Sequence, residues 1–239
     1  MNTIEIISDA LVYPLRNIKK LVLFIVLGII AAFIGGASLL SFVGAASTDG
    51  IAYLEMNWLE ILKFFISLLI VFLIEGYGLD IIKFSIERRT GSPEIDIRSQ
   101  TINASKIVAI EIIYYFAPLV FILILGLFFN DLILVIITLI FIIVFSLADI
   151  MARCRLAKMG SLTRALAIEE SIKDIPKVGV GKLLVTTSLI VIITYLIIYV
   201  IDIIYATNIN LGSILLGITL VYWIFFYHRA IGLLYSNIY

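Results

Sequence analysis

The stretch Leu132–Ile150 reads LILVIITLIFIIVFSLADI and carries a single charged side chain, Asp149, next to its end. An α-helix rises about 1.5 Å per residue, so about 20 apolar residues cross the hydrocarbon core of a bilayer. Backbone groups in lipid must be hydrogen-bonded within the segment, as they are in a helix. A transmembrane β-strand would instead alternate polar and apolar residues over about ten positions. The stretch therefore predicts a membrane-spanning helix.

Five further runs have the same apolar character: Leu21–Ala46, Ile61–Ile82, Ile107–Phe129, Leu183–Ile204 and Leu211–Tyr227. The chain of 239 residues is 63% hydrophobic and 14% charged, and a water-soluble domain of this composition would expose a large apolar surface. We therefore expect an all-α protein in which residues 1–239 form a single integral membrane domain, a polytopic bundle of six transmembrane helices.

The basic residues are distributed unevenly around these runs. All of the 17 Lys and Arg residues except Lys63 lie in the N-terminal segment, in the long loops after the second and fourth runs, or in the C-terminal tail. The short connections after the first, third and fifth runs contain none. Because basic residues beside membrane spans stay on the cytoplasmic side, we expect both termini and both long loops to be cytoplasmic. The chain is then a multi-pass protein of the cell (cytoplasmic) membrane.

The segment before the first run has an amphipathic pattern. Apolar residues recur every three to four positions, at Ile4, Ile7, Leu11, Leu15 and Ile18. This pattern predicts a short interfacial helix lying among the lipid headgroups, interrupted at Tyr13-Pro14. The following apolar run is longer than the apolar region of a signal peptide, so we expect it to be retained as a span.

Two features of the runs concern helix packing. Gly28, Ala32 and Gly36 lie four residues apart on one helix face, a stripe that allows a second helix to approach closely. We expect that helix to belong to the same chain, with a second subunit as the alternative. Pro118 lies well inside the third run and predicts a kink, because it lacks the N–H of a helical hydrogen bond and its ring clashes with the preceding turn.

Glu75 and Glu111 are the candidate intramembrane polar site, because ionisable groups are costly in lipid and often functional there. Both lie at similar depth on consecutive runs. Facing each other, they would hold a proton or a cation. The favoured interpretation is structural, with each acid protonated or hydrogen-bonded to a tyrosine, namely Tyr77, Tyr114 or Tyr115. Asp149 is expected to pair with Arg153, four residues further on.

The sequence predicts no catalytic residue, metal site or cofactor. It contains one histidine, His228, and one cysteine, Cys154, which is too few for a zinc site and excludes an internal disulfide bond. It also lacks the glycine-rich loop of a nucleotide-binding site and the nucleophile and metalloprotease motifs. The basic loops are explained by topology, so no nucleic-acid partner is expected. The expected partners are the lipid bilayer and either another membrane protein or a second copy of the chain.

Several short motifs occur in a characteristic order: Tyr13-Pro14, Gly76-Tyr77, residues 91–96 (GSPEID), residues 114–118 (YYFAP), and Ala152-Arg153 followed by residues 160–166 (GSLTRAL). In this order they resemble an uncharacterised family of multi-spanning membrane proteins common in methanogenic archaea, domain of unknown function 4013. The resemblance covers most of the chain. It implies an archaeal multi-spanning membrane protein without an assigned activity, so it transfers no catalytic residues.

Two classes of function remain. The leading hypothesis is a non-enzymatic accessory or scaffold component of the membrane, because catalytic motifs are missing and polar groups inside the runs are few. The alternative is a small-solute or ion transporter or channel that uses Glu75, Glu111 and the bend at Pro118. An intramembrane enzyme acting on lipids is less favoured, since no nucleophile and base are visible.

Overall fold

A computed structural model describes residues 1–45 and 58–238, with the backbone alone described at residues 36–45, 60 and 131. Within these residues all regular structure is helical, as predicted. The helices are α1 (Thr3–Arg16), α2 (Ile18–Ala45), α3 (Trp58–Ile86), α4 (Ile97–Leu125), α5 (Asp131–Met159), α6 (Leu162–Ala165), α7 (Ile168–Val178), α8 (Val180–Thr207) and α9 (Ile209–Tyr235), followed by a 3₁₀ turn at Ser236–Ile238.

Six helices in the described part of the chain are long and apolar enough to cross a membrane, which confirms the predicted spans. Their apolar segments are Ile18–Gly35, Ile61–Ile86, Ile97–Leu125, Leu132–Met159, Val180–Thr207 and Ile209–Ile238. Several helices continue past the predicted runs, because a helix ends at its caps rather than at the edge of the hydrocarbon. Asp96 caps the start of α4, and Gly160, in a left-handed conformation, ends α5. The predicted first run ends at Ala46, outside the described residues.

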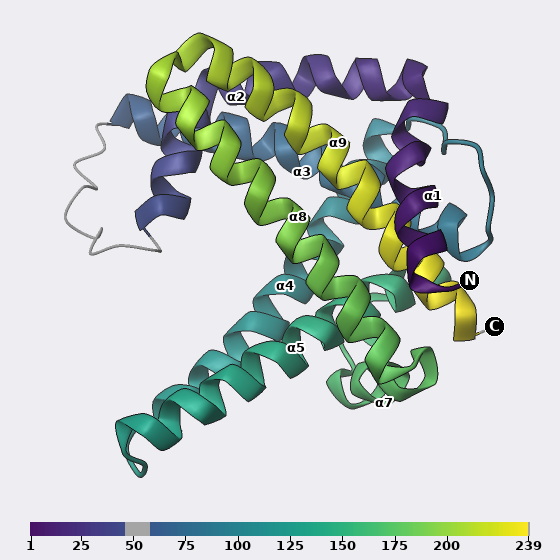
Figure 1. The fold of residues 1–239 in the computed structure, drawn as a ribbon, viewed down its shortest axis with the longest axis vertical. Helices are drawn as coiled ribbons and strands as arrows, with labels where there is room; N and C mark the ends of the chain where they lie inside the picture. Colours follow the sequence, from purple (N-terminus) through teal and green to yellow (C-terminus); the bar gives the residue numbers. More distant parts are fainter. Residues whose placement is uncertain (46–57, 239) are drawn as a thin grey trace.

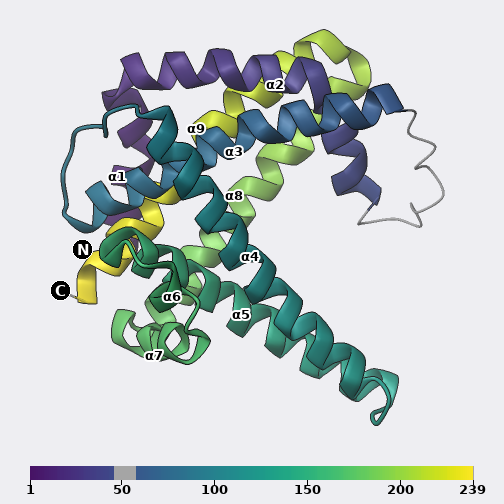
Figure 2. The same ribbon diagram turned by 180° about the vertical axis from the view of Figure 1, so that it is seen from behind.

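The spans form two groups that meet near the chain termini (Figures 1 and 2). Helices α2, α3, α8 and α9 pack on one another, and the hairpin of α4 and α5 extends away from them. No described side chain from Leu119 to Ser146 is buried, whereas most side chains from Leu147 to Ala157 are. The outer half of this hairpin thus lies free of the rest of the chain, with exposed apolar side chains that suit contact with lipid.

Helix α1 packs on α9 with one face and leaves its apolar stripe exposed. Asn2 and Glu5 form a capping box at its start. Ile6 and Ala10 are buried, whereas Ile4 is 78% exposed, as an interfacial helix requires. The predicted interruption at Tyr13-Pro14 is wrong, since α1 continues to Arg16. Pro14 removes one backbone hydrogen bond a single turn before the helix ends, which limits its cost.

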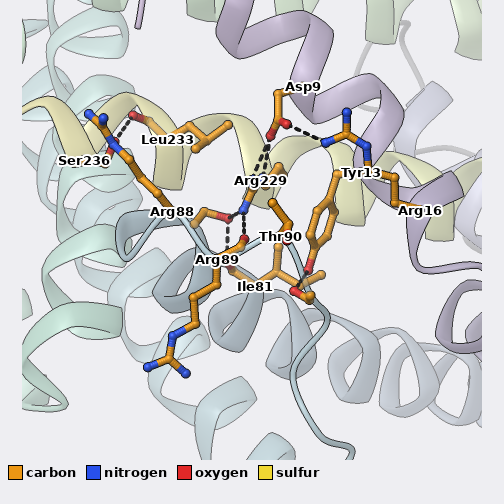
Figure 3. A network of polar contacts seen from close by, with 12 residues as sticks. Asp9, Tyr13, Arg16, Ile81, Arg88, Arg89, Thr90, Arg229, Leu233 and Ser236 are labelled. Atoms are coloured by element: carbon orange, nitrogen blue, oxygen red, sulfur yellow. Dashed lines mark hydrogen bonds and ion pairs between the residues drawn. The ribbon is translucent and has the colours of Figure 1, made fainter.

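Arg229 of α9 fixes α1 in place (Figure 3). Its guanidinium is 3% exposed and donates hydrogen bonds from Nε and Nη2 to Asp9 Oδ2, both at 2.8 Å. It also donates to the carbonyl oxygen of Arg89 at 2.6 Å and lies over the ring of Tyr13, 4.7 Å from its centroid. Burial raises the pKa of Tyr13 to about 12 although the charge of Arg229 opposes the shift, so this phenol stays neutral.

Asp174 attaches α7 in a similar way. Its carboxylate accepts hydrogen bonds from Arg155 of α5 at 2.8 Å, from Lys177 at 2.7 Å and from the Tyr235 hydroxyl of α9 at 3.1 Å. Burial alone would raise the pKa of Asp174. The hydrogen bonds from Lys177 and Arg155 outweigh it and hold the pKa below its ordinary value.

Replacing Asp174→Asn should lower the stability of the protein in detergent at pH 7 by about 1.5–3 kcal/mol, the usual worth of a hydrogen bond to a charged group. A carboxylate with a lowered folded-state pKa stabilises the fold above its unfolded pKa of about 3.9 and loses that contribution as the pH falls through the folded value. The difference between the variant and the parent protein should therefore shrink below about pH 4. Thermal unfolding followed by circular dichroism measures it.

Glu169→Gln is the matched control on the same helix, because Glu169 forms an exposed pair with Lys173 at 2.6 Å. It should leave the unfolding temperature nearly unchanged, because exposed ion pairs contribute little to stability. An equal loss in both variants, or a loss in Asp174→Asn that does not depend on pH, would contradict the assigned role of Asp174.

Candidate functional site

Ionisable side chains from four spans meet around Arg153 of α5. Its Nη2 lies 2.6 Å from Glu111 Oε1 of α4, its Nε 3.0 Å from Asp149 Oδ2, and its Nη1 3.8 Å from Glu75 Oε2 of α3. On the far side of Glu75, its Oε2 lies 3.2 Å from Nε2 of His228 on α9. We call Glu75, Glu111, Asp149, Arg153 and His228 the Arg153 cluster.

Two glycines of α3 bring the neighbouring helices close enough for this cluster to form. A Cβ at Gly76 would lie 1.9 Å from the carbonyl oxygen of Gln100, so only glycine lets α4 cross α3 there. A Cβ at Gly78 would lie 2.6 Å from Cε1 of His228, so this glycine makes room for the imidazole. The two glycines that flank Tyr77 thus position α4 and α9 around Glu75.

The hydroxyls of two predicted tyrosines, Tyr77 and Tyr114, form hydrogen bonds to a loop and to the α6–α7 region, not to the two acids. The Tyr77 hydroxyl donates to the carbonyl oxygen of Pro93 at 3.1 Å. The Tyr114 hydroxyl lies 3.0 Å from the carbonyl oxygen of Ala165 and 2.8 Å from Ser171 Oγ. The side chain of Tyr115 is 54% exposed. Glu75 and Glu111 are therefore brought together, as one hypothesis required, but across a shared arginine.

The cluster contains three carboxylates and one guanidinium, with His228 as the fifth ionisable group. Arg153, Asp149 and His228 are at most 7% exposed, whereas the Glu75 and Glu111 side chains are 20% and 37% exposed. Glu111 is thus the member most accessible from outside the bundle. With all three acids ionised and His228 neutral, the cluster carries two excess negative charges in a medium of low dielectric constant, which is strongly unfavourable.

The geometry of His228 leaves room for an additional proton in the cluster. Nδ1 lies 2.7 Å from the carbonyl oxygen of Ile224, which only accepts hydrogen bonds, so Nδ1 carries a hydrogen. In a neutral ring Nε2 then presents a lone pair toward Glu75 Oε2. Two lone pairs at 3.2 Å repel each other, and neither atom has a hydrogen-bond partner among the described residues, so a proton on either group would relieve the contact.

Arg153 and His228 are the partners of the two acids, in place of the tyrosines that the sequence predicted. Arg153 was assigned only to Asp149, and that pairing is confirmed at 3.0 Å. His228 directly follows the last predicted run, Leu211–Tyr227, but α9 continues to Tyr235, so the imidazole lies inside the bundle. A signal was present, because Arg153 and His228 each lie next to a predicted run, and each precedes the end of its helix by about two turns.

The predicted packing stripe contacts a helix of the same chain. A Cβ at Gly28 would lie 2.6 Å from the carbonyl oxygen of Gly217, so α2 and α9 cross in near backbone contact. Ala32 lines an apolar pocket of about 310 Å³ between α2, α3, α8 and α9. The surroundings of Gly36 lie outside the described residues.

Helix α4 continues through Pro118, whose kink remains a prediction. Among the described residues no group of His, Cys, Asp and Glu has the geometry of a metal site.

Replacing Arg153→Leu should lower stability by about 3–5 kcal/mol, because it leaves carboxylates buried without a counter-charge. Arg153→Lys should lower it less, since it keeps the charge but loses the three-way hydrogen bonding of the guanidinium. Thermal unfolding in detergent measures both. Arg16→Leu removes a half-exposed pair with Asp9 and should have little effect. Unchanged stability in Arg153→Leu would refute a central role for this arginine.

Comparison with known proteins places the chain in a family. A family model described as "Protein of unknown function (DUF4013)" matches residues 59–207, which is well over half of the 239 residues. The match runs from α3 to α8 and includes Glu75, Glu111, Asp149 and Arg153, but it ends before His228. No curated protein and no solved structure matched the chain. As its motifs predicted, the chain belongs to the DUF4013 family, whose function is unknown.

Proposed function

We propose that this protein is a proton-linked carrier of the cell membrane, in which the Arg153 cluster takes up and releases a proton as a small solute crosses the bilayer. The observation that carries the proposal is the 3.2 Å contact between His228 Nε2 and Glu75 Oε2, two buried atoms without a hydrogen-bond partner in the described part of the chain, which a shared proton would stabilise. The proposal includes cytoplasmic termini, inferred from the basic residues. It also includes an archaeal cell membrane, implied by the family resemblance.

The charge of the cluster supports a site that exchanges protons. Even with one proton shared by His228 and Glu75, the ionised Glu111 and Asp149 exceed the single charge of Arg153. A second proton, or a cationic solute, would neutralise the cluster. Glu111 is the most exposed member, so the exchange would take place there. Intramembrane acids that pair with arginine and histidine are common in the proton relays of transporters.

Arg153 provides a means of linking protonation to helix movement. It lies 2.6 Å from Glu111 but 3.8 Å from Glu75, so it is bound more tightly to α4 than to α3. Loss of the proton between His228 and Glu75 would leave a full negative charge on Glu75 and draw the guanidinium toward α3. Its bond to Glu111 would then weaken and loosen α4. A proton that binds one arrangement better than the other shifts the population between them, as a carrier needs.

Glu75→Gln and Glu111→Gln should each lower proton-coupled solute uptake by about 10²-fold or more, because each removes a proton acceptor. Proteoliposomes with a trapped pH-sensitive dye measure the uptake when amino acids, sugars and monovalent cations are added in turn. Glu94→Gln is the control, since Glu94 is exposed in the loop between α3 and α4. Uptake at the parent rate in Glu75→Gln would contradict the proposal.

The proton itself can be observed directly, because His228 is the sole histidine of the chain. With ¹⁵N-labelled histidine, nuclear magnetic resonance reports the protonation of both nitrogens of this ring alone. Nδ1 should carry a hydrogen in both proteins, and the Nε2 signal at one fixed pH should differ between the parent and Glu75→Gln. An Nε2 signal that is identical in the parent and the variant would show that the two groups share no proton.

A second candidate, the accessory or scaffold protein, is favoured by the free outer half of the α4–α5 hairpin. Leu127, Phe128 and Leu132 at its tip are 73–81% exposed, and long apolar side chains cover both helices. Such a surface fits the spans of a partner protein as well as it fits lipid. In this case the Arg153 cluster would serve to hold the base of the hairpin rigid.

A photo-crosslinking residue in place of Phe116 or Ile140, irradiated in native membranes, separates the two candidates. The scaffold hypothesis predicts one discrete protein adduct from these positions. Val185, which is 53% exposed on α8, is the control position and should give no such adduct. Adducts with lipid alone at all three positions would contradict the scaffold hypothesis.

A further inference from the structure

A polar pocket of about 170 Å³ lies where the end of α3, the start of α4 and the end of α5 meet. It belongs to neither the Arg153 cluster nor the apolar pocket beside Ala32. Its wall is made by residues of all three helices, namely Asp80, Lys83, Ser99, Asn103, Lys106 and Gly160, and its apolar side by Leu79, Leu156 and Ala157.

The pocket is separated from the Arg153 cluster by one layer of apolar side chains. On α3, Lys83, Leu79 and Glu75 succeed one another at intervals of four residues, and on α4 so do Asn103, Ile107 and Glu111. Leu79 and Ile107 are buried in the same core. Each interval is about 6 Å along the helix, so Lys83 and Asn103 at the pocket lie about 12 Å along their helices from Glu75 and Glu111, toward the ends where the basic loops begin.

The pocket carries one net positive charge, because it contains two ammonium groups and one carboxylate. Asp80 Oδ1 is already held by a hydrogen bond from Asn103 Nδ2 at 3.0 Å. Lys106 Nζ makes a hydrogen bond of 3.5 Å to the carbonyl oxygen of Gly160, which is long and leaves its other hydrogens for a ligand. Ser99 lines the pocket from the first turn of α4, whose N-terminus is capped by the Asp96 carboxylate.

We propose that this pocket binds a singly charged phosphate group between Lys83 and Lys106, with the Ser99 hydroxyl as a further donor. The net charge of the pocket matches a phosphodiester, and Asp80 would repel a second negative charge on the ligand. Such a group comes either from a phospholipid headgroup of the adjacent leaflet or from free phosphate. Basic pockets between helices at the membrane edge bind anionic headgroups. The lipid therefore has the advantage of a high local concentration.

The test measures ligand-induced thermal stabilisation of the full chain in a neutral detergent. The probes are a short-chain phosphatidylglycerol, the matching phosphatidylcholine and inorganic phosphate. The double variant Lys83→Gln, Lys106→Gln should bind phosphatidylglycerol about 10–100-fold more weakly than the parent, since each ammonium supplies a hydrogen bond to a charged group. The control is Lys19→Gln, Lys20→Gln, which removes the same charge at the start of α2 and should keep the parental affinity.

Asp80→Asn provides an independent test that does not weaken the pocket. It keeps an oxygen for the hydrogen bond from Asn103 but removes the repulsion, so the affinity for phosphatidylglycerol should rise several-fold. Stabilisation by phosphatidylglycerol alone supports a lipid ligand, and equal stabilisation by inorganic phosphate supports a soluble one. Stabilisation by neither probe, an equal loss in both lysine pairs, or weaker binding by Asp80→Asn would overturn the proposal.

Discussion

A single guanidinium holds the base of this bundle together. Arg153 contacts carboxylates on α3, on α4 and on its own helix, and Glu75 extends the contacts to His228 on α9. In a soluble protein such a cluster competes with water for its partners, whereas inside a bilayer the alternative is an unpaired charge in hydrocarbon. These contacts can form because Gly76 and Gly78 have no side chains and let α4 and His228 of α9 approach α3 closely. The two glycines of α3 and the charged residues of the Arg153 cluster therefore depend on one another, although they come from four different spans.

The same chemistry attaches the two short helices outside the spans. Arg229 binds Asp9 of α1, and Arg155 binds Asp174 of α7. In each case a buried arginine near the end of a span holds an aspartate of an amphipathic helix. Basic residues at these positions are usually interpreted as markers of topology. Here the same basic residues also bind the two short helices, so the number of basic residues near the spans reflects packing as well as topology.

The fold could be predicted from the sequence to a large extent because bilayer thickness sets the length of each apolar run. The helix ends were harder, since α4 begins ten residues before its predicted run and Pro14 does not interrupt α1. Glu75 and Glu111 could be identified from their cost in lipid. Their partners could not, because a tyrosine nearby in the sequence and an arginine 42 residues from Glu111 are equal candidates until helix crossings are known. The pocket with Lys83 and Lys106 depends on three helix ends and has no local motif.

The α4–α5 hairpin has a mechanical consequence. It is held near its base, where α3 crosses it at Gly76 and where Tyr114, Arg153 and Arg155 bind neighbouring elements, while no described side chain of its outer half is buried. The part of α5 from Asp131 to Arg153 is about 33 Å long, so a tilt of about 5° at Arg153 would displace the tip by about 3 Å. Under the proposed carrier function, a change of one unit charge at this ion pair would be transmitted along the hairpin as a movement of its tip.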